Sequence, residues 1–281
     1  MSGYDLHTHS TFSDGVTTIE HNLEVAARIG LEGIGVTDHD TTAPFALATE
    51  VATRLGLDVV LGTEFSAEED GVSIHLLGYG IDPTDPALGA ELARLRDARG
   101  RRARAMVAKL QTLGVPVRLA RVEALAAGAP IGRPHVAAAV VELGAAASLE
   151  EVFDRYLADG GPAYVPKHAV RPERAVELLR AAGGVAVLAH PGLFGARDGH
   201  DGVPAPVIER LAAAGLAGLE VDHPDHTEDQ RRHYRGMARS LGLLVTGGSD
   251  HHGAGARARI GVATTPREVV EALRARCRPR S

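Results

Sequence analysis

The chain has few of the residues on which several classes of protein depend. Among its 281 residues there is one cysteine, Cys277, no tryptophan, and only 4% aromatic residues. A single cysteine excludes an internal disulfide, and its place in a polar tail gives it no catalytic context, so a reducing compartment is expected. No apolar run approaches the ~18 residues of a membrane span, and no basic leader precedes the first motif. We therefore expect a cytoplasmic protein with no membrane partner.

An excess of positive charge is also absent. The 30 Lys and Arg residues face 36 Asp and Glu residues, which gives a net charge of −6. This balance argues against a general electrostatic attraction to nucleic acid or to anionic membranes, so any phosphate site must be local. What the chain does contain is aliphatic material, because 44% of its residues are hydrophobic. That is enough for one large domain or a barrel with an insertion.

Short apolar runs of strand length alternate with Ala- and Leu-rich stretches of helical spacing. Many of these stretches end in a glycine, which suits a helix C-terminus. Seven near-continuous apolar strands that alternate with helices predict a parallel sheet buried on both faces, most simply a closed α/β barrel. The predicted strands cover residues 3–7, 33–38, 58–64, 72–79, 184–190, 216–222 and 243–248.

Residues 86–165 break this alternation, because they contain helical patterns and no strand-like run. We expect a barrel formed by residues 1–85 and 166–281, with a helical insertion domain between its two parts. The arginines between residues 94 and 109 lie on a predicted helix without aromatic stacking partners. This favours a solvated helix face over an oligonucleotide-binding rim.

Potential metal ligands gather where the predicted strands end, and in parallel α/β barrels these ends converge on one mouth. His7 and His9 follow the first strand, and their spacing places both imidazoles on one face of an extended segment. His75 lies within the fourth strand, so its direction depends on the register. The other candidates, in chain order, are Asp14, His39, Glu64, His190, Asp250 and His252.

These residue types in this pattern indicate a metal centre. Imidazole nitrogens and carboxylate oxygens without thiolates suit Zn, Mn or Fe. A lone buried histidine is more often a structural residue than a ligand, but that explanation does not cover a whole set at strand ends. Nine candidate ligands exceed what one tetrahedral ion can use, so more than one metal ion is predicted.

Several neighbouring residues have two interpretations each. Asp38 either supports a metal-bound imidazole or caps the next loop. Asp5, two residues before His7, either supports the ligands or is a polar residue at the barrel mouth. Arg133 precedes a predicted helix, where a guanidinium and a helix N-terminus together suit an anion.

Two further residues are candidates for substrate contacts. Lys167 follows a Pro-containing turn, where a lysine is usually solvated. His223 follows the sixth predicted strand and either lines the mouth or is an ordinary loop histidine.

Six motifs make the chain similar to a known family. HTHSTFSDG, TDHDTT, GTEFS, IHLLGYG, LAHPG and GSDHHG resemble, in order and spacing, the motifs of the PHP (polymerase and histidinol phosphatase) superfamily. The greatest similarity is to the branch of nucleoside 3′,5′-bisphosphate phosphatases, which includes the 5′-to-3′ exoribonuclease AM. The resemblance covers nearly the whole chain and implies a distorted (β/α)7 barrel (the PHP fold) with a small all-helical insertion that serves as a lid.

The resemblance also implies three divalent metal ions, with Mn²⁺ expected and Fe or Zn as alternatives. The first ion would be held by His7, His9, Glu64 and Asp250, the second by Glu64, His75 and His190, and the third by Asp14, His39 and His252. The family spacing D-x-H selects His252 and leaves His251 outside the set. The nucleophile would be a metal-bound hydroxide, so no protein nucleophile is expected, and a general acid is not evident.

For the substrate, the resemblance implies that Arg133 contacts phosphate. Relatives often carry an arginine directly after AHPG, whereas this chain has Leu193 there and Arg197 later, which puts one phosphate contact in doubt. The function implied is removal of the 3′-phosphate from nucleoside 3′,5′-bisphosphates, with exonuclease action on short 5′-phosphorylated RNA as a possible second activity. The alternatives are a phosphatase for histidinol phosphate or another small metabolite, and a non-catalytic metal-stabilised module. The expected partner is a small phosphorylated nucleotide or short oligonucleotide, and no stable protein partner is inferred.

Overall fold

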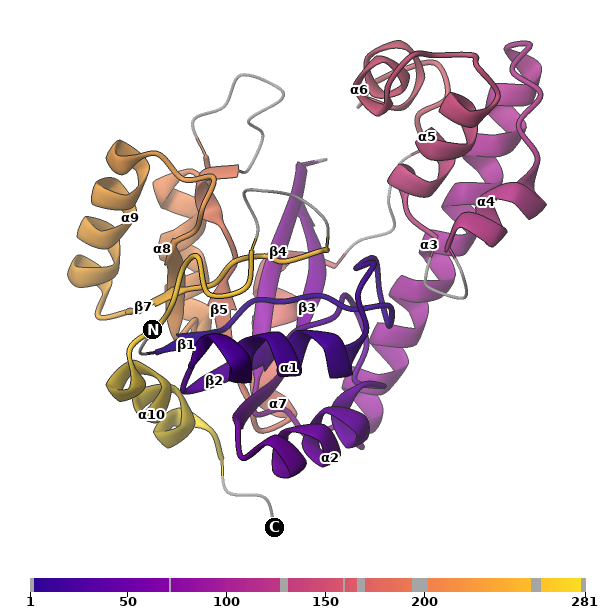
Figure 1. Ribbon diagram of the computed structural model, residues 1–281. Coiled ribbons are helices and arrows are strands. Elements are labelled where there is room, and N and C mark those ends of the chain that lie inside the picture. The colour runs from indigo at the N-terminus through magenta and orange to yellow at the C-terminus, as the bar shows by residue number, and fades with distance from the viewer. Residues whose placement is uncertain are drawn as a thin grey trace. The chain divides into compact units, whose positions relative to one another are not determined.

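The computed structural model describes residues 3–70, 72–126, 131–158, 160–165, 170–193, 202–253 and 259–278. The chain divides into two compact units. The first, the barrel unit, comprises Met1–Leu92 and Ala169–Ser281, and the second, the helical unit, comprises Ala93–His168. Figure 1 shows the strands and helices of both units along the chain.

Seven strands form the sheet of the barrel unit, and they follow one another around it in chain order. They are β1 (Tyr4–Asp5), β2 (Gly33–Val36), β3 (Asp58–Glu69), β4 (Val72–Tyr79), β5 (Val185–Leu188), β6 (Gly218–Asp222) and β7 (Leu244–Gly247). The segments after β1 and β7 meet at the seam, where the Asp250 N–H donates to the His7 carbonyl at 2.9 Å. The sheet is therefore nearly closed, which confirms the predicted distorted (β/α)7 barrel.

One strand runs against the expected direction. β4 pairs antiparallel with β3, from Gly62 opposite Tyr79 to Glu69 opposite Val72, and it also pairs antiparallel with β5. Only residues 70 and 71 separate β3 from β4, whereas a parallel pair needs a crossover of a dozen or more residues. The expectation of a wholly parallel sheet was therefore wrong for β4. β3 also continues five residues beyond Glu64 into this hairpin, so Glu64 lies within the strand and not at its end.

Helices surround the sheet of the barrel unit. They are α1 (Ile19–Ile29), α2 (Phe45–Leu55), α7 (Pro172–Ala181), α8 (Ala205–Ala214), α9 (Glu228–Leu241) and α10 (Arg267–Arg276), with a 3₁₀ turn η2 at Pro191–Leu193. As predicted, α1 and α9 end at glycines, Gly30 and Gly242. Their φ angles of 78° and 67° lie in the left-handed region, which favours glycine. The inner face of α1 buries Ile19, Leu23 and Ala26 in one core cluster with β2 and α2.

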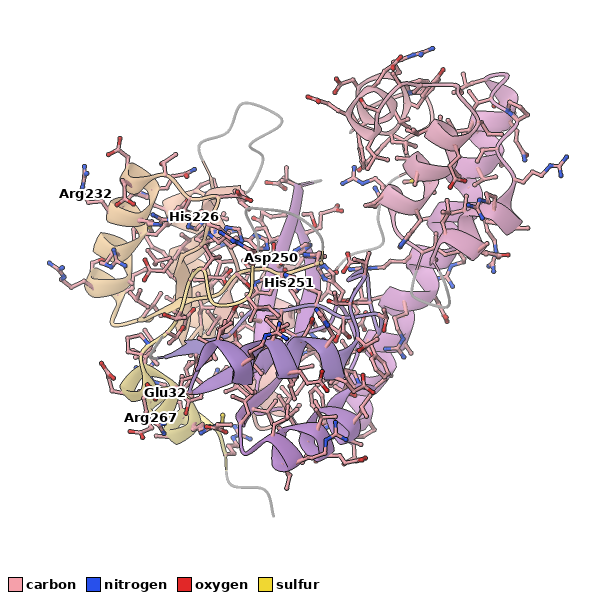
Figure 2. All side chains as sticks on the ribbon, in the orientation of Figure 1. Glu32, His226, Arg232, Asp250, His251 and Arg267 are labelled. Atoms are coloured by element: carbon pink, nitrogen blue, oxygen red, sulfur yellow. The ribbon has the colours of Figure 1, made fainter. Side chains whose placement is uncertain are left out.

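Ion pairs from α10 lie at the N-terminal ends of β2 and β3. Arg267 pairs with Glu32 at 2.7 Å, and Arg274 pairs with Asp58 at 2.8 Å; Figure 2 labels Arg267 and Glu32. The hydroxyl of Tyr4 also donates to Asp58 at 2.8 Å. This end of the strands is thus occupied by structural pairs, which leaves the C-terminal ends for other chemistry.

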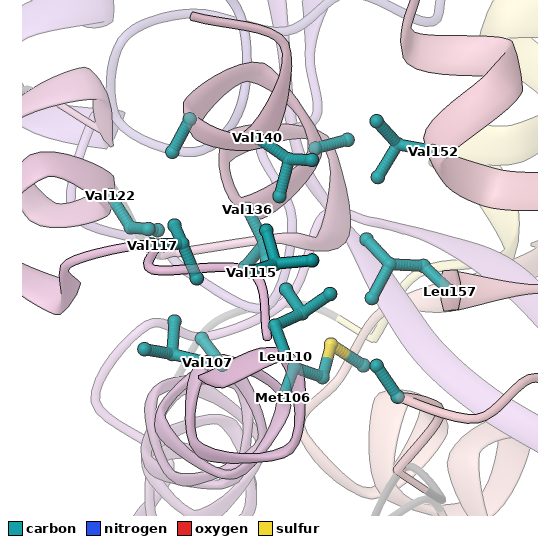
Figure 3. Close-up of a cluster of buried hydrophobic side chains, with 14 of the residues drawn as sticks. Met106, Val107, Leu110, Val115, Val117, Val122, Val136, Val140, Val152 and Leu157 are labelled. Atoms are coloured by element: carbon teal, nitrogen blue, oxygen red, sulfur yellow. The ribbon is translucent and has the colours of Figure 1, made fainter. Parts of the chain in front are cut away.

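The helical unit is built around an aliphatic core. α3 (Pro86–Thr112) begins in the barrel unit and continues into the helical unit, which also contains α4 (Leu119–Ala126), α5 (Arg133–Glu142), α6 (Leu149–Val152) and a π-helical turn η1 (Phe153–Leu157). Figure 3 shows Met106 and Leu110 of α3 packed near Val136, Val140 and Leu157. None of the described helices is long and apolar enough to cross a lipid bilayer.

Candidate metal centre

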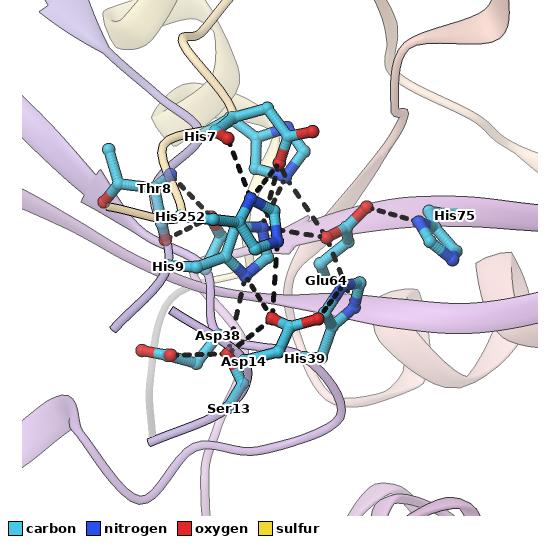
Figure 4. Close-up of polar contacts among 12 residues, drawn as sticks. His7, Thr8, His9, Ser13, Asp14, Asp38, His39, Glu64, His75 and His252 are labelled. Atoms are coloured by element: carbon cyan, nitrogen blue, oxygen red, sulfur yellow. Dashed lines mark hydrogen bonds and ion pairs between the residues drawn. The ribbon is translucent and has the colours of Figure 1, made fainter. Parts of the chain in front are cut away.

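The predicted ligand side chains of the barrel unit converge on one polar cluster, which Figure 4 shows in part. The segments after β1, β2, β5 and β7 supply His7, His9, Asp14, His39, His190, Asp250 and His252. Glu64 and His75 come from the antiparallel pair β3 and β4, at positions that lie within the strands. The C-terminal ends of the parallel strands and this hairpin thus face the same interior space.

The histidine pair after β1 has the geometry that its spacing predicts. Nε2 of His7 lies 3.0 Å from Nε2 of His9, and both side chains are fully buried. Gly248 makes room for this arrangement, because a Cβ atom built there would lie 2.4 Å from the Cβ of His7. Two imidazole nitrogens therefore face one point from the same side of the strand.

Glu64 is the centre of the cluster. Its Oε2 atom lies 3.2 Å from Nε2 of His7 and 3.1 Å from Nε2 of His9. Its Oε1 atom lies 2.7 Å from Nδ1 of His75 and 3.1 Å from Nε2 of His190. The two oxygens of one carboxylate thus reach four imidazoles from three different segments, so Glu64 is placed to bridge two groups of ligands.

Asp14 organises a third group. It lies 3.3 Å from His252, 3.6 Å from His39 and 3.7 Å from His9, measured between the nearest oxygen and nitrogen atoms. His252, rather than His251, therefore lies in the cluster, with its ring 4.0 Å from that of His9 between centroids.

Ligand-type atoms within 4.8 Å of one another form three groups among the described residues. These are His7, His9, Glu64 and Asp250; His9, Asp14, His39 and His252; and His39, Glu64 and His75. The first has the composition implied by the family resemblance, whereas His9 joins the group around Asp14. In the group around His75, His39 takes the place that the resemblance gives to His190, although His190 also contacts Glu64.

Two residues of the cluster have strained backbones. Asp250 and His190 have φ angles of 53° and 28°, values that side chains other than glycine rarely adopt. Such strain persists only where surrounding contacts hold it, and it is concentrated at functional sites. His190 follows the end of β5 by two residues and Asp250 follows the end of β7 by three, so both strained residues lie where the chain leaves a strand and enters the cluster.

The charges of the cluster are strongly coupled. Burial by itself would raise the pKa of Glu64, but the imidazoles of His39, His75 and His7 hold that pKa well below its usual range. Burial likewise opposes the charged form of His9, yet the facing carboxylates of Asp250 and Glu64 raise its pKa to about 10. The carboxylates are consequently ionised at neutral pH and available to a cation.

A divalent metal ion would satisfy the buried ligand atoms of the cluster better than hydrogen bonds among them do. Oε2 of Glu64 and Oδ1 of Asp250 are buried and have no hydrogen-bond partner among the described residues. Each lies 3.1 and 3.2 Å from the two facing nitrogens of His7 and His9. Nitrogen and oxygen atoms that point at one space in this way form a hard to intermediate donor set, which suits Mn, Fe or Zn.

The two aspartates with open interpretations are buried, and neither hydrogen-bonds directly to a ligand imidazole. Asp38 accepts the N–H of Ser10 at 2.8 Å and the hydroxyl of Ser13 at 2.7 Å, and Ser13 in turn lies 3.5 Å from Nδ1 of His9. Asp5 accepts backbone N–H groups of Ser249 and Gly261, each at 2.8 Å, and burial raises its pKa to about 6. Asp38 thus reaches the ligands through a serine, while Asp5 orders the segment after β7.

The four candidate residues for substrate contacts lie in different parts of the chain. His223 is buried at the cluster, with Nε2 3.6 Å from Oδ2 of Asp250. Arg133 begins α5 in the helical unit, where its guanidinium lies 5.7 Å from the ring of Phe153. Lys167 and Arg197 lie outside the described residues.

The turn after His190 is held by α9. Gln230 donates to the Gly192 carbonyl at 2.9 Å, and the Tyr234 hydroxyl donates to the Pro191 carbonyl at 3.1 Å. His226, labelled in Figure 2, accepts the Gly192 N–H on Nε2 at 3.0 Å. Burial lowers the pKa of His226, which keeps it neutral for this role.

Sequence analysis missed Glu220. This glutamate lies in β6, is 1% exposed, and contacts Nδ1 of His7 at 3.1 Å. The detectable sign was a charged residue inside the otherwise apolar run LAGLEV of a buried strand, where an unpaired carboxylate would be costly.

Comparisons with known proteins agree with this geometry. The PHP domain family matches residues 5–113. The chain is 34% identical over 255 residues to the 5'-3' exoribonuclease Rnm of Escherichia coli (89% of this chain, 85% of the relative). It is 35% identical over 265 residues to the 3',5'-nucleoside bisphosphate phosphatase of Chromobacterium violaceum (91% and 89%).

A solved structure is also similar over nearly its whole length. The crystal structure of a candidate metal-dependent phosphoesterase from Bifidobacterium adolescentis superposes with a TM-score of 0.91 at 34% identity, covering 99% of this chain and 97% of that one. Relatives at more than 30% identity thus align with about nine tenths of the chain, and the chain belongs to the PHP domain family.

Proposed function

We propose that this protein is a metal-dependent phosphoesterase that removes the 3′-phosphate from nucleoside 3′,5′-bisphosphates. The observation that carries this proposal is the convergence of histidine and carboxylate ligand atoms in three groups at one end of the barrel. The names of the two relatives, a nucleoside bisphosphate phosphatase and an exoribonuclease, support a phosphorylated nucleotide as substrate. Action on short 5′-phosphorylated RNA in the 5′-to-3′ direction is the second activity of the proposal.

The metal part of the proposal assigns three divalent ions, with Mn²⁺ first and Fe or Zn as alternatives. His7, His9, Glu64 and Asp250 would hold one, Glu64, His75 and His190 a second, and Asp14, His39 and His252 a third. Such ions supply Lewis-acid chemistry, since they activate water and neutralise charge on a phosphate group. The chain itself contributes the fixed spacing of the groups, which Glu64 sets through its contacts with His7, His9, His75 and His190.

We assign substrate recognition to four residues of the chain. His223 is buried beside Asp250, and we assign it a hydrogen bond to a phosphate or a leaving oxygen at the cluster. Arg133 in the helical unit, which we take as the lid domain of the insertion, binds a phosphate of the substrate. Lys167 and Arg197 remain candidates for further phosphate contacts.

The test is phosphate release by the Mn²⁺-loaded protein from adenosine 3′,5′-bisphosphate, histidinol phosphate and a short 5′-phosphorylated RNA. We expect the bisphosphate to be turned over fastest, and Arg133→Ala to lose that preference. Arg121→Ala is the matched control, because Arg121 belongs to the same unit but pairs with Glu142 on the surface.

Other outcomes are equally informative. Fastest hydrolysis of histidinol phosphate would replace the proposed substrate by a small metabolite. No hydrolysis of any of the three by a protein that has taken up metal would favour a non-catalytic metal-stabilised module.

A further inference from the structure

We infer that Glu220 is a positioning residue of the metal centre, which orients the ligands His7 and His190 without touching the metal. The inference rests on the proposed function, because it concerns the same cluster. Glu220 is not among the residues of the three ligand groups, although it is almost completely buried beside them. Its contacts therefore go to the ligands and not to the space between them.

The first contact fixes the ring of His7. Nδ1 of His7 lies 3.1 Å from both oxygens of Glu220, while Nε2, on the opposite side of the ring, faces His9, Glu64 and Asp250. An ionised carboxylate can only accept hydrogen bonds, so Nδ1 carries a hydrogen and Nε2 is the nitrogen left to bind a cation. A carboxylate behind a ligating imidazole selects the binding tautomer and increases the basicity of the ligand.

The second contact fixes the backbone of His190. Its N–H donates to Oε2 of Glu220 at 2.9 Å, and this residue has the strained φ angle of 28°. The same residue places Nε2 at 3.1 Å from Oε1 of Glu64. Glu220 thus holds a left-handed backbone in place at the point where the ligand leaves β5.

A carboxylate suits both contacts better than an amide does, because both of its oxygens accept and it carries a negative charge. Glu220 has two acceptor oxygens for two donors, whereas a glutamine has one acceptor oxygen and an NH₂ group that would face an N–H. The space around the carboxylate is also reserved, because a Cβ atom at Gly248 would lie 2.9 Å from its Oε1. A glutamine at this position therefore fills the same volume, but it lacks the negative charge and places an NH₂ group close to Nδ1 of His7, which lies 3.1 Å from both oxygens of Glu220.

The experiment is a titration of the Glu220→Gln variant with Mn²⁺, in which electron paramagnetic resonance measures the concentration of the free ion. Asp222→Asn is the matched control, because it makes the same change on the same strand at a carboxylate that binds Arg235 on the surface. We expect Glu220→Gln to raise the Mn²⁺ dissociation constant by about 10- to 100-fold. The control should bind Mn²⁺ like the wild type.

Two further measurements separate positioning from a general structural role. ¹⁵N NMR of the Zn²⁺-loaded protein should show His7 protonated on Nδ1 in the wild type and a changed tautomer signal in Glu220→Gln, while the metal-free variant still gives a cooperative unfolding transition. If Glu220→Gln does not fold, Glu220→Asp takes its place. The aspartate keeps the negative charge, but its side chain is shorter by one methylene group, so the carboxylate lies farther from His7 and His190. This variant should also weaken Mn²⁺ binding.

The inference and the proposed function fail in different ways. An unchanged Mn²⁺ dissociation constant in the Glu220 variants overturns the inference, whatever the substrate is. A wild type that binds Mn²⁺ but hydrolyses no phosphoester overturns the proposed function and leaves the role of Glu220 standing.

Discussion

The two units of this protein bury different kinds of side chain. The barrel unit encloses a histidine and carboxylate cluster in which His7 and His9 are fully buried and Glu64 is 1% exposed. In the helical unit, across its described residues 93–126, 131–158 and 160–165, every buried side chain is hydrophobic, with Met106 and Leu110 at the centre.

Because of this difference, the two units are stabilised by different interactions. Buried charges cost free energy unless they are paired, and in the barrel the pairs are histidines and carboxylates held close together around one space. Buried aliphatic side chains need no partner other than close packing. A bound cation should therefore stabilise the barrel unit, and packing alone should stabilise the helical unit.

The largest expected effect comes from Glu64→Gln. Glutamine removes the negative charge and one of two acceptor oxygens from a side chain that contacts His7, His9, His75 and His190. We expect phosphate release to fall by more than roughly 100-fold, because loss of a ligand exceeds the 10- to 100-fold cost of losing an outer partner. Metal content and activity should fall together. Glu68→Gln, on the same strand but outside the ligand groups, should retain both, and equal losses in the two variants would refute the assignment.

The matching change in the helical unit is Leu110→Ala. Leu110 is fully buried in α3, and removing such a side chain lowers the free energy of unfolding by about 2–5 kcal/mol. Urea denaturation should show this loss in the helical unit, while Mn²⁺ binding is unchanged. Leu113→Ala is the control, since Leu113 is 45% exposed and such surface changes cost at most about 0.5 kcal/mol. Loss of Mn²⁺ binding in Leu110→Ala would show that the units are coupled.

The fold and the cluster were largely predictable because strand ends carry a readable pattern. The spacing of His7 and His9 fixes which face both rings occupy, and the ends of parallel strands must converge. The direction of β4 was missed because an apolar run does not state which way it pairs. The gap between the two predicted strands, residues 65–71, held that information, since it is shorter than the dozen or more residues of a parallel crossover.

The supporting contacts were less predictable, because they join residues that no local pattern connects. Glu220 meets His7 across 213 positions of sequence, and Asp38 meets Ser13 across 25. Each looks like an ordinary polar residue in its own segment. Only the closed barrel brings these pairs together.

Metal removal tests the comparison directly. Mn²⁺ at 100 times its dissociation constant stabilises a one-site protein by about 2.7 kcal/mol, and EDTA removes that contribution. Hydrogen exchange of the wild type should therefore become faster around β1, β6 and β7 after EDTA, but not in the segment 103–117 of the helical unit. If hydrogen exchange became equally faster in both units, the bound metal would stabilise the helical unit as well as the barrel unit, and the comparison would fail.

The smallest expected effect comes from helix caps, one in each unit. Thr227 caps α9 by accepting the Gln230 N–H at 3.2 Å, and Ser148 caps α6 by accepting the Glu151 N–H at 3.2 Å. Replacing either residue by alanine should cost about 1 kcal/mol of stability. Gln230 also donates to the Gly192 carbonyl in the turn after His190, so the Thr227→Ala variant should lower phosphate release slightly as well.

Among the described residues, the helix that Ser148 caps has no hydrogen bond to the turn after His190, so Ser148→Ala should leave Mn²⁺ binding unchanged. Thr227→Ser keeps the capping hydroxyl and should have the stability and phosphate release of the wild type. Thermal unfolding, phosphate release and Mn²⁺ titration of the three variants provide the measurement. If Thr227→Ala and Ser148→Ala change Mn²⁺ binding equally, the cap of α9 has no special link to the cluster. If only Thr227→Ala does, a local hydrogen bond at the start of a surface helix contributes to the position of His190, because Gln230 belongs to both networks.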